Sequence, residues 1–192
     1  SRVPIAFLML ASVSGCSPST PLEGSGVSIG VPESWQPASP DAWTVPGVPL
    51  AAWAGPKGSS FVIYRSLPIP GGTAAMIVES LKNRLTNLPD LKVLVHREET
   101  VAGQPAARVE VVASGGGDAF APSGAGTPVS VNGKPLIPTR QVTVGFARPD
   151  ATLFLSWHMP EQDHEQILPE IETMLKRLSL AERPGAPSSY TD

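Results

Sequence analysis

The chain of 192 residues carries a formal net charge of −3, and only 16% of its residues are charged. Its Lys and Arg residues are scattered and form no basic stripe with interleaved aromatic residues, so we expect no nucleic-acid partner. A single Cys excludes an intramolecular disulfide bond. The part of the chain that follows residue 16 is long enough for one domain with a hydrophobic core, which must be held together by packing.

The first residues have the pattern of an export signal. An apolar segment from Val3 to Val13 follows Arg2. This segment is shorter than the roughly 20 apolar residues that a transmembrane helix needs, and it has the length of the hydrophobic region of a signal peptide. The sequence begins at Ser1 and not at Met, and it leaves open whether residues precede Ser1. We therefore expect residues 1–15 to be a signal peptide.

The end of this segment, Val13-Ser14-Gly15-Cys16, resembles the bacterial lipobox. In that motif an aliphatic residue and two small residues precede a Cys whose thiolate takes a diacylglyceryl group. The resemblance implies that cleavage leaves Cys16 as the N-terminus, attached to a membrane by two or more acyl chains such as palmitate. The alternative, a buried free thiol at the start of a core helix, conflicts with the prolines of residues 17–21, which stop a helix.

Residues 16–26 are expected to be the lipidated Cys and a flexible tether, because this segment is polar, rich in Ser, Pro and Gly, and not periodic. The alternative is an arm that packs on the domain through Leu22. A single domain over residues 27–181 and a disordered tail over residues 182–192 follow. Ser17 after Cys16 is compatible with the outer membrane if the host is Gram-negative.

The first half of the domain predicts three strands and a helix. Residues 27–31 alternate as a half-buried strand does, and Pro32-Glu33-Ser34-Trp35 ends it. Residues 36–49 hold four prolines and are expected to be a loop. Residues 50–54 and 60–67 predict a hairpin around the turn at 55–58. Apolar residues at helical spacing predict a helix over 73–88, with Thr73 as its cap and Pro89 as its stop.

The second half predicts further hairpins and a closing helix. Alternation predicts strands over 91–100 and 107–111, joined by a turn at 103–105. Residues 114–126 are expected to be a mobile loop, and Asn132-Gly133 predicts a hairpin turn. Residues 141–147 and 152–157 predict the last hairpin. A helix is predicted over 161–180, and Pro169 implies that it begins near Ile167 or kinks there.

Together these elements predict an α+β fold, with an antiparallel sheet of about six or seven strands and two main helices packed on it. Their order and spacing resemble the PsbP-like fold and its bacterial lipoprotein members, the LpqN-type and DcrB-type families. The resemblance implies an α/β/α sandwich, a binding or assembly role in an envelope or thylakoid, and no shared catalytic motif. It covers residues 27–180 and is carried by the opening strand with residues 32–35, and by residues 83–89, 100–106 and 174–180.

The sequence predicts no catalytic residue, no metal site and no cofactor. His158 and His164 are expected to approach each other at the corner between the last strand and the last helix, with Asp163 nearby. This group supports an alternative hypothesis, a small envelope hydrolase or metal-dependent enzyme, although two His without a third ligand do not define a metal site. No phosphate-binding loop is present, and no G-x-S-x-G sequence stands between a predicted strand and a predicted helix, where a nucleophile elbow requires it.

Acidic and aromatic residues allow two interpretations. Glu98, Glu99 and Glu110 are interpreted as solvated strand residues, with paired-carboxylate hydrolysis as the alternative. The four Trp residues either fill the core and cap the sheet, or Trp35, Trp43 and Trp53 line a groove for an apolar ligand or a partner peptide.

The favoured functional hypothesis is a membrane-anchored extracytoplasmic lipoprotein that acts as a non-catalytic binding or assembly module of the cell envelope. Its expected partners are the membrane, through the lipid on Cys16, and an envelope protein or a small apolar ligand. A structural lipoprotein that contacts the cell wall is a further alternative. The sequence specifies neither the ligand nor the oligomeric state.

Overall fold

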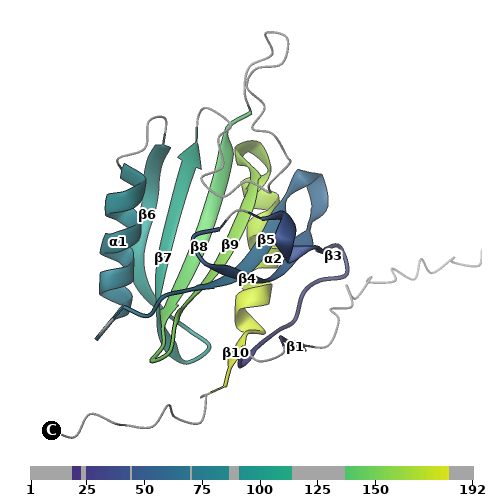
Figure 1. Cartoon of the computed structure of the whole chain (residues 1–192). Helices are drawn as coiled ribbons and strands as arrows, with labels where there is room; N and C mark the ends of the chain where they lie inside the picture. Colours follow the sequence, from purple (N-terminus) through teal and green to yellow (C-terminus); the bar gives the residue numbers. More distant parts are fainter. Residues whose placement is uncertain are drawn as a thin grey trace, which may run out of the picture.

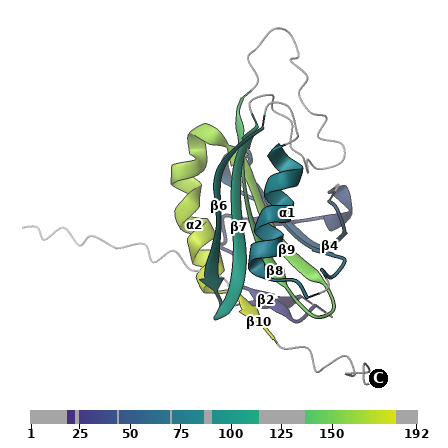
Figure 2. The ribbon, with the colours of Figure 1, turned by 90° about the vertical axis from the view of Figure 1, so that its left-hand side faces the viewer.

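The computed structural model describes residues 19–22, 25–43, 45–69, 71–86, 91–113 and 137–181, with only the backbone described for 84–86. These residues form three layers, in which a seven-stranded sheet lies between two helices (Figures 1 and 2). Helix α1 (Ala74–Thr86) covers one face of the sheet, and α2 (His164–Lys176) covers the other. The predicted α+β class with two main helices is confirmed.

The large sheet has the order β3-β4-β5-β9-β8-β7-β6, and all neighbouring strands are antiparallel. The three predicted hairpins, which correspond to β4–β5, β6–β7 and β8–β9, are confirmed. The strands are β3 (Gln36–Ala38), β4 (Val48–Ala54), β5 (Ser60–Ser66), β6 (Leu91–Val101), β7 (Gln104–Ala113), β8 (Thr139–Ala147) and β9 (Thr152–Pro160).

A second, three-stranded sheet joins the two ends of the described chain. It contains β1 (Thr20–Leu22), β2 (Val27–Ile29) and β10 (Ser179–Leu180) in the order β1-β2-β10. The predicted strand at 27–31 therefore belongs to this small sheet and not to the large one. Residues 20–22, expected in the tether, and residues 179–180, expected in the helix, are strands instead. Leu22 packs against the core, as the alternative of a packed arm expects.

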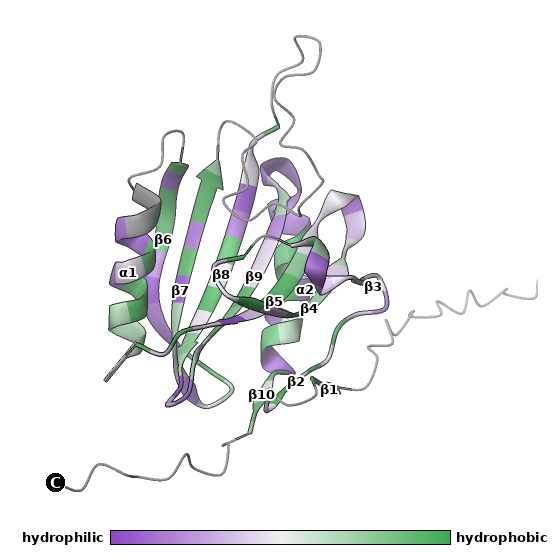
Figure 3. Cartoon of the chain, in the orientation of Figure 1, coloured by the Kyte–Doolittle hydropathy of each residue, from purple (hydrophilic) through white to green (hydrophobic). Residues whose placement is uncertain are grey.

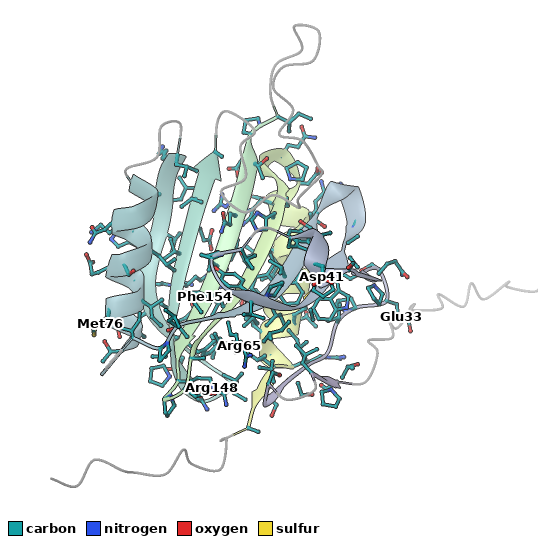
Figure 4. The ribbon with its side chains drawn as sticks, viewed as in Figure 1. Glu33, Asp41, Arg65, Met76, Arg148 and Phe154 are labelled. Atoms are coloured by element: carbon teal, nitrogen blue, oxygen red, sulfur yellow. The ribbon has the colours of Figure 1, made fainter. Side chains whose placement is uncertain are left out.

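One side chain links these two ends further. Arg148, in the turn between β8 and β9, donates hydrogen bonds to the carbonyl oxygens of Ser25 (3.3 Å) and Ala181 (2.7 Å). Figure 4 shows Arg148 at the end of the sheet where β10 leaves the domain. The backbone N–H of Ala181 also donates to the carbonyl of Gly26 (2.8 Å). The entry into β2 and the exit from β10 are thus held together.

The region 36–49 is not wholly a loop. It contains β3, a short 3-10 helix η1 (Pro40–Ala42) and the start of β4. Pro37 lies within β3, and it is tolerated there because β3 is an edge strand that pairs only with β4. The prolines that suggested a loop therefore mark a sheet edge.

Local signals explain the other boundaries. The hydroxyl of Thr73 accepts a hydrogen bond from the backbone N–H of Met76 (3.3 Å), so the predicted cap of α1 is confirmed. The β6–β7 turn is formed by Ala102 and Gly103, both with positive φ, one residue earlier than predicted. Helix α2 begins at His164, after the 3-10 helix η4 (Glu161–Asp163), so a start near Ile167 is wrong.

Alternating residues of the sheet supply two cores, and Figure 3 shows green apolar bands along the central strands. The core beneath α2 includes Phe61, Ile63, Val142, Val144, Leu155, Trp157, Ile171 and Met174. The core beneath α1 includes Val62, Tyr64, Ile77, Leu81, Val109, Val111 and Phe154. Burial of the apolar face of α2 compensates for the backbone hydrogen bond that Pro169 cannot donate.

Several predictions concern residues outside the described ranges. These are the signal peptide, the lipobox with Cys16, the loop at 114–126, the turn at Asn132-Gly133 and the tail after residue 181. Among the helices that the structure describes, none is long and apolar enough to cross a membrane.

Close contact between α1 and the sheet depends on Gly145. A Cβ atom at this position would lie 2.9 Å from Ile77 Cγ2 and 2.9 Å from the Phe154 ring. We predict that Gly145→Ala lowers the free energy of unfolding by about 1–3 kcal/mol, as measured by denaturant titration. Gly30→Ala is the matched control, because its Cβ would meet only side-chain atoms, Arg177 Cδ at 3.0 Å and Cβ at 3.3 Å and Ser19 Oγ at 3.5 Å, and it should cost less than about 1 kcal/mol. Equal losses would contradict the close-packing explanation.

Candidate functional site

A pocket of about 620 Å³ lies beside β1, β3 and β4. This volume falls within the range of pockets that bind small molecules, about 300–1,000 Å³. Figure 4 shows one rim residue, Glu33, on the side of the molecule away from α1. The pocket is lined by Thr20, Val31, Pro32, Glu33, Trp35, Gln36, Pro37, Ala38, Pro40, Leu50, Ala51, Ala52 and Trp53.

Stacked aromatic rings support the two Trp residues of the pocket. Trp53 stacks on Phe61 with ring centroids 5.0 Å apart, and Phe61 stacks on Trp157 at 4.4 Å. Trp35 meets Phe61 edge-on at 6.4 Å. Because Phe61 and Trp157 are fully buried, these rings have fixed partners behind them, and the pocket has a rigid aromatic wall.

The polar atom of Trp35 is already engaged. Its indole N–H and the Ser34 hydroxyl (3.0 Å) both donate to the Glu170 carboxylate of α2. Gly55 leaves room for the Trp35 ring, since a Cβ there would lie 2.6 Å from Trp35 Cζ3. Apart from the indole groups, the polar lining residues are Thr20, Glu33 and Gln36. The pocket therefore offers mainly hydrocarbon and aromatic surface to a ligand.

Trp43 lies elsewhere. It belongs to the core beneath α1, and its ring lies 6.0 Å from that of His158. The structure thus brings Trp35 and Trp53 to one pocket and places Trp43 on the other face of the sheet. The groove for an apolar ligand or a partner peptide remains a prediction, and of its three expected Trp residues only Trp35 and Trp53 line the pocket.

The expected approach of His158 and His164 is wrong. Trp157 points into the core beneath α2, so the next residue on the strand, His158, points to the opposite face. His164 begins α2 on the other side, where its Nε2 lies 3.9 Å from Glu110 Oε2. Asp163 pairs with Lys57 at 3.0 Å. In the described parts of the chain, no group of three or more His, Cys, Asp or Glu residues could hold a metal ion.

His158 instead takes part in a buried polar cluster beneath α1. Its Nε2 lies 3.2 Å from the Ser156 hydroxyl, which in turn contacts Thr143 (3.0 Å) and Gln141 (3.1 Å). Ser156 is 0% exposed and the other three residues are also buried. Hydrogen bonding within this cluster satisfies the Ser156 hydroxyl and His158 Nε2 inside the fold, away from solvent.

A network of buried charges lies between β7, β8 and α2. Arg108 and Glu110 are only 3% and 5% exposed, and they bond to each other at 2.9 Å. Arg108 also reaches Glu172 of α2 (2.7 Å) and Glu99 (3.7 Å). The interpretation of Glu110 as a solvated residue is therefore wrong.

Arg140 of β8 extends this network. It pairs with Glu110 (2.7 Å) and with Glu161 of η4 (3.2 Å). The network thus attaches the start and the middle of α2 to the sheet through charges, whereas Trp157 and Met174 hold the helix through apolar contact and an indole N–H to Sδ hydrogen bond (3.4 Å).

The network shifts the pKa values of its members. Burial alone raises the pKa of Glu110, but the hydrogen bond from Arg140 and the charge of Arg108 outweigh it, and the pKa lies below its usual value. Burial lowers the pKa of Arg108, but the hydrogen bond and charge of Glu172 outweigh burial and raise it. For His164, burial and the charge of Arg140 lower the pKa, and Glu110 offsets them only in part.

Comparison with known proteins finds solved structures with a similar fold. No family model matches the chain, and no curated protein matches its sequence. The solution structure of the cyanobacterial PsbP protein (CyanoP) of Synechocystis sp. PCC 6803 is similar, with a TM-score of 0.57, 9% identity, and coverage of 93% of this chain and 100% of that one. LpqN, a protein involved in cell envelope biogenesis of Mycobacterium tuberculosis, has a TM-score of 0.52 and 16% identity, with coverage of 81% of this chain and 83% of LpqN.

The chain has the PsbP-like fold. The resemblance predicted from the order and spacing of elements is confirmed at this level. Identities of 9% and 16% show the fold alone. The pocket and the charge network of this PsbP-like domain are therefore interpreted from its own residues.

Loss of Arg108 should strongly destabilise the PsbP-like domain. Arg108→Met removes the 2.9 Å partner of buried Glu110 and leaves Arg140 (2.7 Å) as its remaining partner, so we predict a loss of about 2–3 kcal/mol in the free energy of unfolding. Lys82→Met is the control, because it removes a partly exposed ion pair with Glu79 (3.7 Å) and should cost about 1 kcal/mol or less. Urea titrations of both variants test this, and a small loss for Arg108→Met would show that the network does not hold α2.

His164 should make the stability of the PsbP-like domain depend on pH. Because its pKa is below the ordinary 6.5 in the folded protein, protonation favours the unfolded chain. The stability that neutral His164 contributes is present above about pH 6.5 and is lost as the pH falls toward the folded pKa. The lowered pKa of Glu110 makes the free energy of unfolding depend on pH only below its usual value of 4.5, which is outside the pH range of the His164 effect.

We predict that the free energy of unfolding falls between about pH 7.5 and 5.5, and that His164→Gln flattens this dependence. His96→Gln, at an exposed position of β6, is the matched control and should keep the wild-type slope. Denaturant titrations at several pH values measure both, and an unchanged slope in His164→Gln would refute the assignment.

Proposed function

We propose that the protein is a lipid-anchored, extracytoplasmic binding module of the cell envelope, and that the pocket beside Trp35 and Trp53 is its recognition site. The observation that carries this proposal is a pocket of about 620 Å³ with a rigid aromatic wall and few polar lining groups. Such a pocket suits an apolar group, either of a small ligand or of a side chain on an envelope protein.

A non-catalytic role agrees with the placement of the reactive side chains. His158 and His164 lie on opposite faces of the sheet, and Ser156 is fully buried. The buried carboxylate of Glu110 and the partly exposed carboxylate of Glu172 are paired with Arg108 and Arg140. These groups therefore serve the packing of α2 and the sheet, and the pocket contains none of them.

The anchor rests on the lipobox pattern at Val13-Ser14-Gly15-Cys16. One further observation supports an envelope location. The similar structure LpqN belongs to a protein involved in cell envelope biogenesis. The pocket residue Thr20 follows Cys16 by only four residues, so the recognition site lies close to the point of attachment.

Binding of a fluorescent apolar probe tests the recognition site. We predict that 1-anilinonaphthalene-8-sulfonate binds the folded protein and that Ala51→Leu, which fills the pocket, weakens its Kd at least about tenfold. Ala54→Leu is the matched control, since Ala54 is exposed on the same strand and does not line the pocket. Equal probe binding by the two variants would exclude the pocket as the site.

Mass spectrometry of protein purified from its native host tests the anchor separately. The proposal expects a chain that begins at a diacylglyceryl-modified Cys16. An uncleaved leader or an unmodified Cys16 thiol would contradict it. Copurification from membranes then identifies the partner.

A further inference from the structure

The arm that carries the proposed lipid also forms part of the recognition pocket. Thr20 is both the first residue of β1 and a lining residue of the pocket. Its position is fixed, because β1 pairs with β2 from Thr20↔Ile29 to Leu22↔Val27 and Leu22 packs on the core. The first described residue, Ser19, lies beside the end of α2, with its hydroxyl 3.5 Å from the carbonyl of Arg177.

Covalent geometry then limits the position of Cys16. Thr20 is four positions along the chain from Cys16, and an extended chain spans at most about 3.3–3.6 Å per residue, so the two Cα atoms can lie no more than about 14 Å apart. The side chain that carries the lipid is therefore attached to the backbone close to the pocket rim.

We propose that the pocket takes one acyl chain of the Cys16 lipid when the protein is away from a bilayer. This inference rests on the proposed function, because it requires the lipid. The chemistry matches: Val31, Leu50, Ala51 and the two Trp residues present apolar surface, and the Trp35 indole N–H is occupied by Glu170. A ligand tethered this closely binds intramolecularly, at an effective concentration of about millimolar.

The same chain has a different preference at a membrane. Each methylene that leaves water is stabilised in a bilayer as it is in the pocket, but the bilayer accommodates every chain at full length. The acyl chain therefore returns to the membrane there, and the pocket opens. The lipid acts as an internal competitor, so that the pocket is available to another ligand only where the protein is anchored.

Thiol accessibility tests this competition in the lipidated, full-length protein. Ala51→Cys places a thiol in the pocket, and Ala54→Cys places one on the exposed part of the same strand as the control. The native Cys16 thioether does not react with a maleimide. We expect maleimide labelling of Ala51→Cys to be at least about tenfold slower in detergent-free buffer than with phosphatidylglycerol–phosphatidylethanolamine vesicles, while labelling of Ala54→Cys changes less than about twofold. Equal rates for Ala51→Cys in the two conditions would overturn the inference.

A longer tether separates intramolecular occupancy from association between molecules. Inserting ten Gly and Ser residues after Ser17 lowers the effective concentration of the chain, so the protection of Ala51→Cys should fall severalfold. Protection that is unaffected by the insertion would come from acyl chains of other molecules and would refute the inference.

Mass spectrometry of the same samples distinguishes the two proposals. If Cys16 carries no lipid, the proposed anchor fails and the inference fails with it. If the lipid is present and the pocket thiol reacts equally in both conditions, only the inference fails.

Discussion

The alternation of side chains along β9 determines most of this architecture. Every residue from Thr152 to Met159 is buried, so both faces of the strand need a covering layer. Leu153, Leu155 and Trp157 point toward α2, and Phe154 and His158 point the other way. A strand buried on both sides requires the two helices to lie on opposite faces, and it places neighbouring residues in different cores.

The pocket follows from the same alternation. Trp157 reaches the α2 side of β9, Phe61 continues the stack on β5, and Trp53 ends it on β4. Beyond β4 only the three-residue edge strand β3 remains, so the row of rings ends beside the pocket, where Trp53 and Trp35 are 9% and 3% exposed. The core beneath α2 therefore ends in aromatic rings at the edge of the sheet, and these rings form one wall of the pocket.

Regular periodicity made much of this fold predictable. The spacing of apolar residues in α1 and the alternation in β6, β7, β8 and β9 identified these elements because each is at least nine residues long. Strands β1, β3 and β10 have two or three residues, too few to show a period, and they exist only because a partner strand is nearby.

The site was less accessible to sequence reasoning. A charged residue on an alternating strand normally faces solvent, and nothing local to Glu110 reveals the arginines and the helix that enclose it. One signal was present: Arg108 and Glu110 lie on the same face of a strand whose other residues are mostly apolar. Trp35 and Trp53 were recognised by residue type, but their shared pocket depends on the edge-strand pairing of β3 with β4.

The small sheet has a mechanical consequence. A pulling force at the N-terminal end of β1 acts first on the pair Thr20↔Ile29, which lies at that end of the strand. Strand β2 stays attached on its other edge to β10, and Arg148 secures its entry. Tension on this end of the domain would therefore meet the three residue pairs of β1 and β2 before it reaches the seven-stranded sheet.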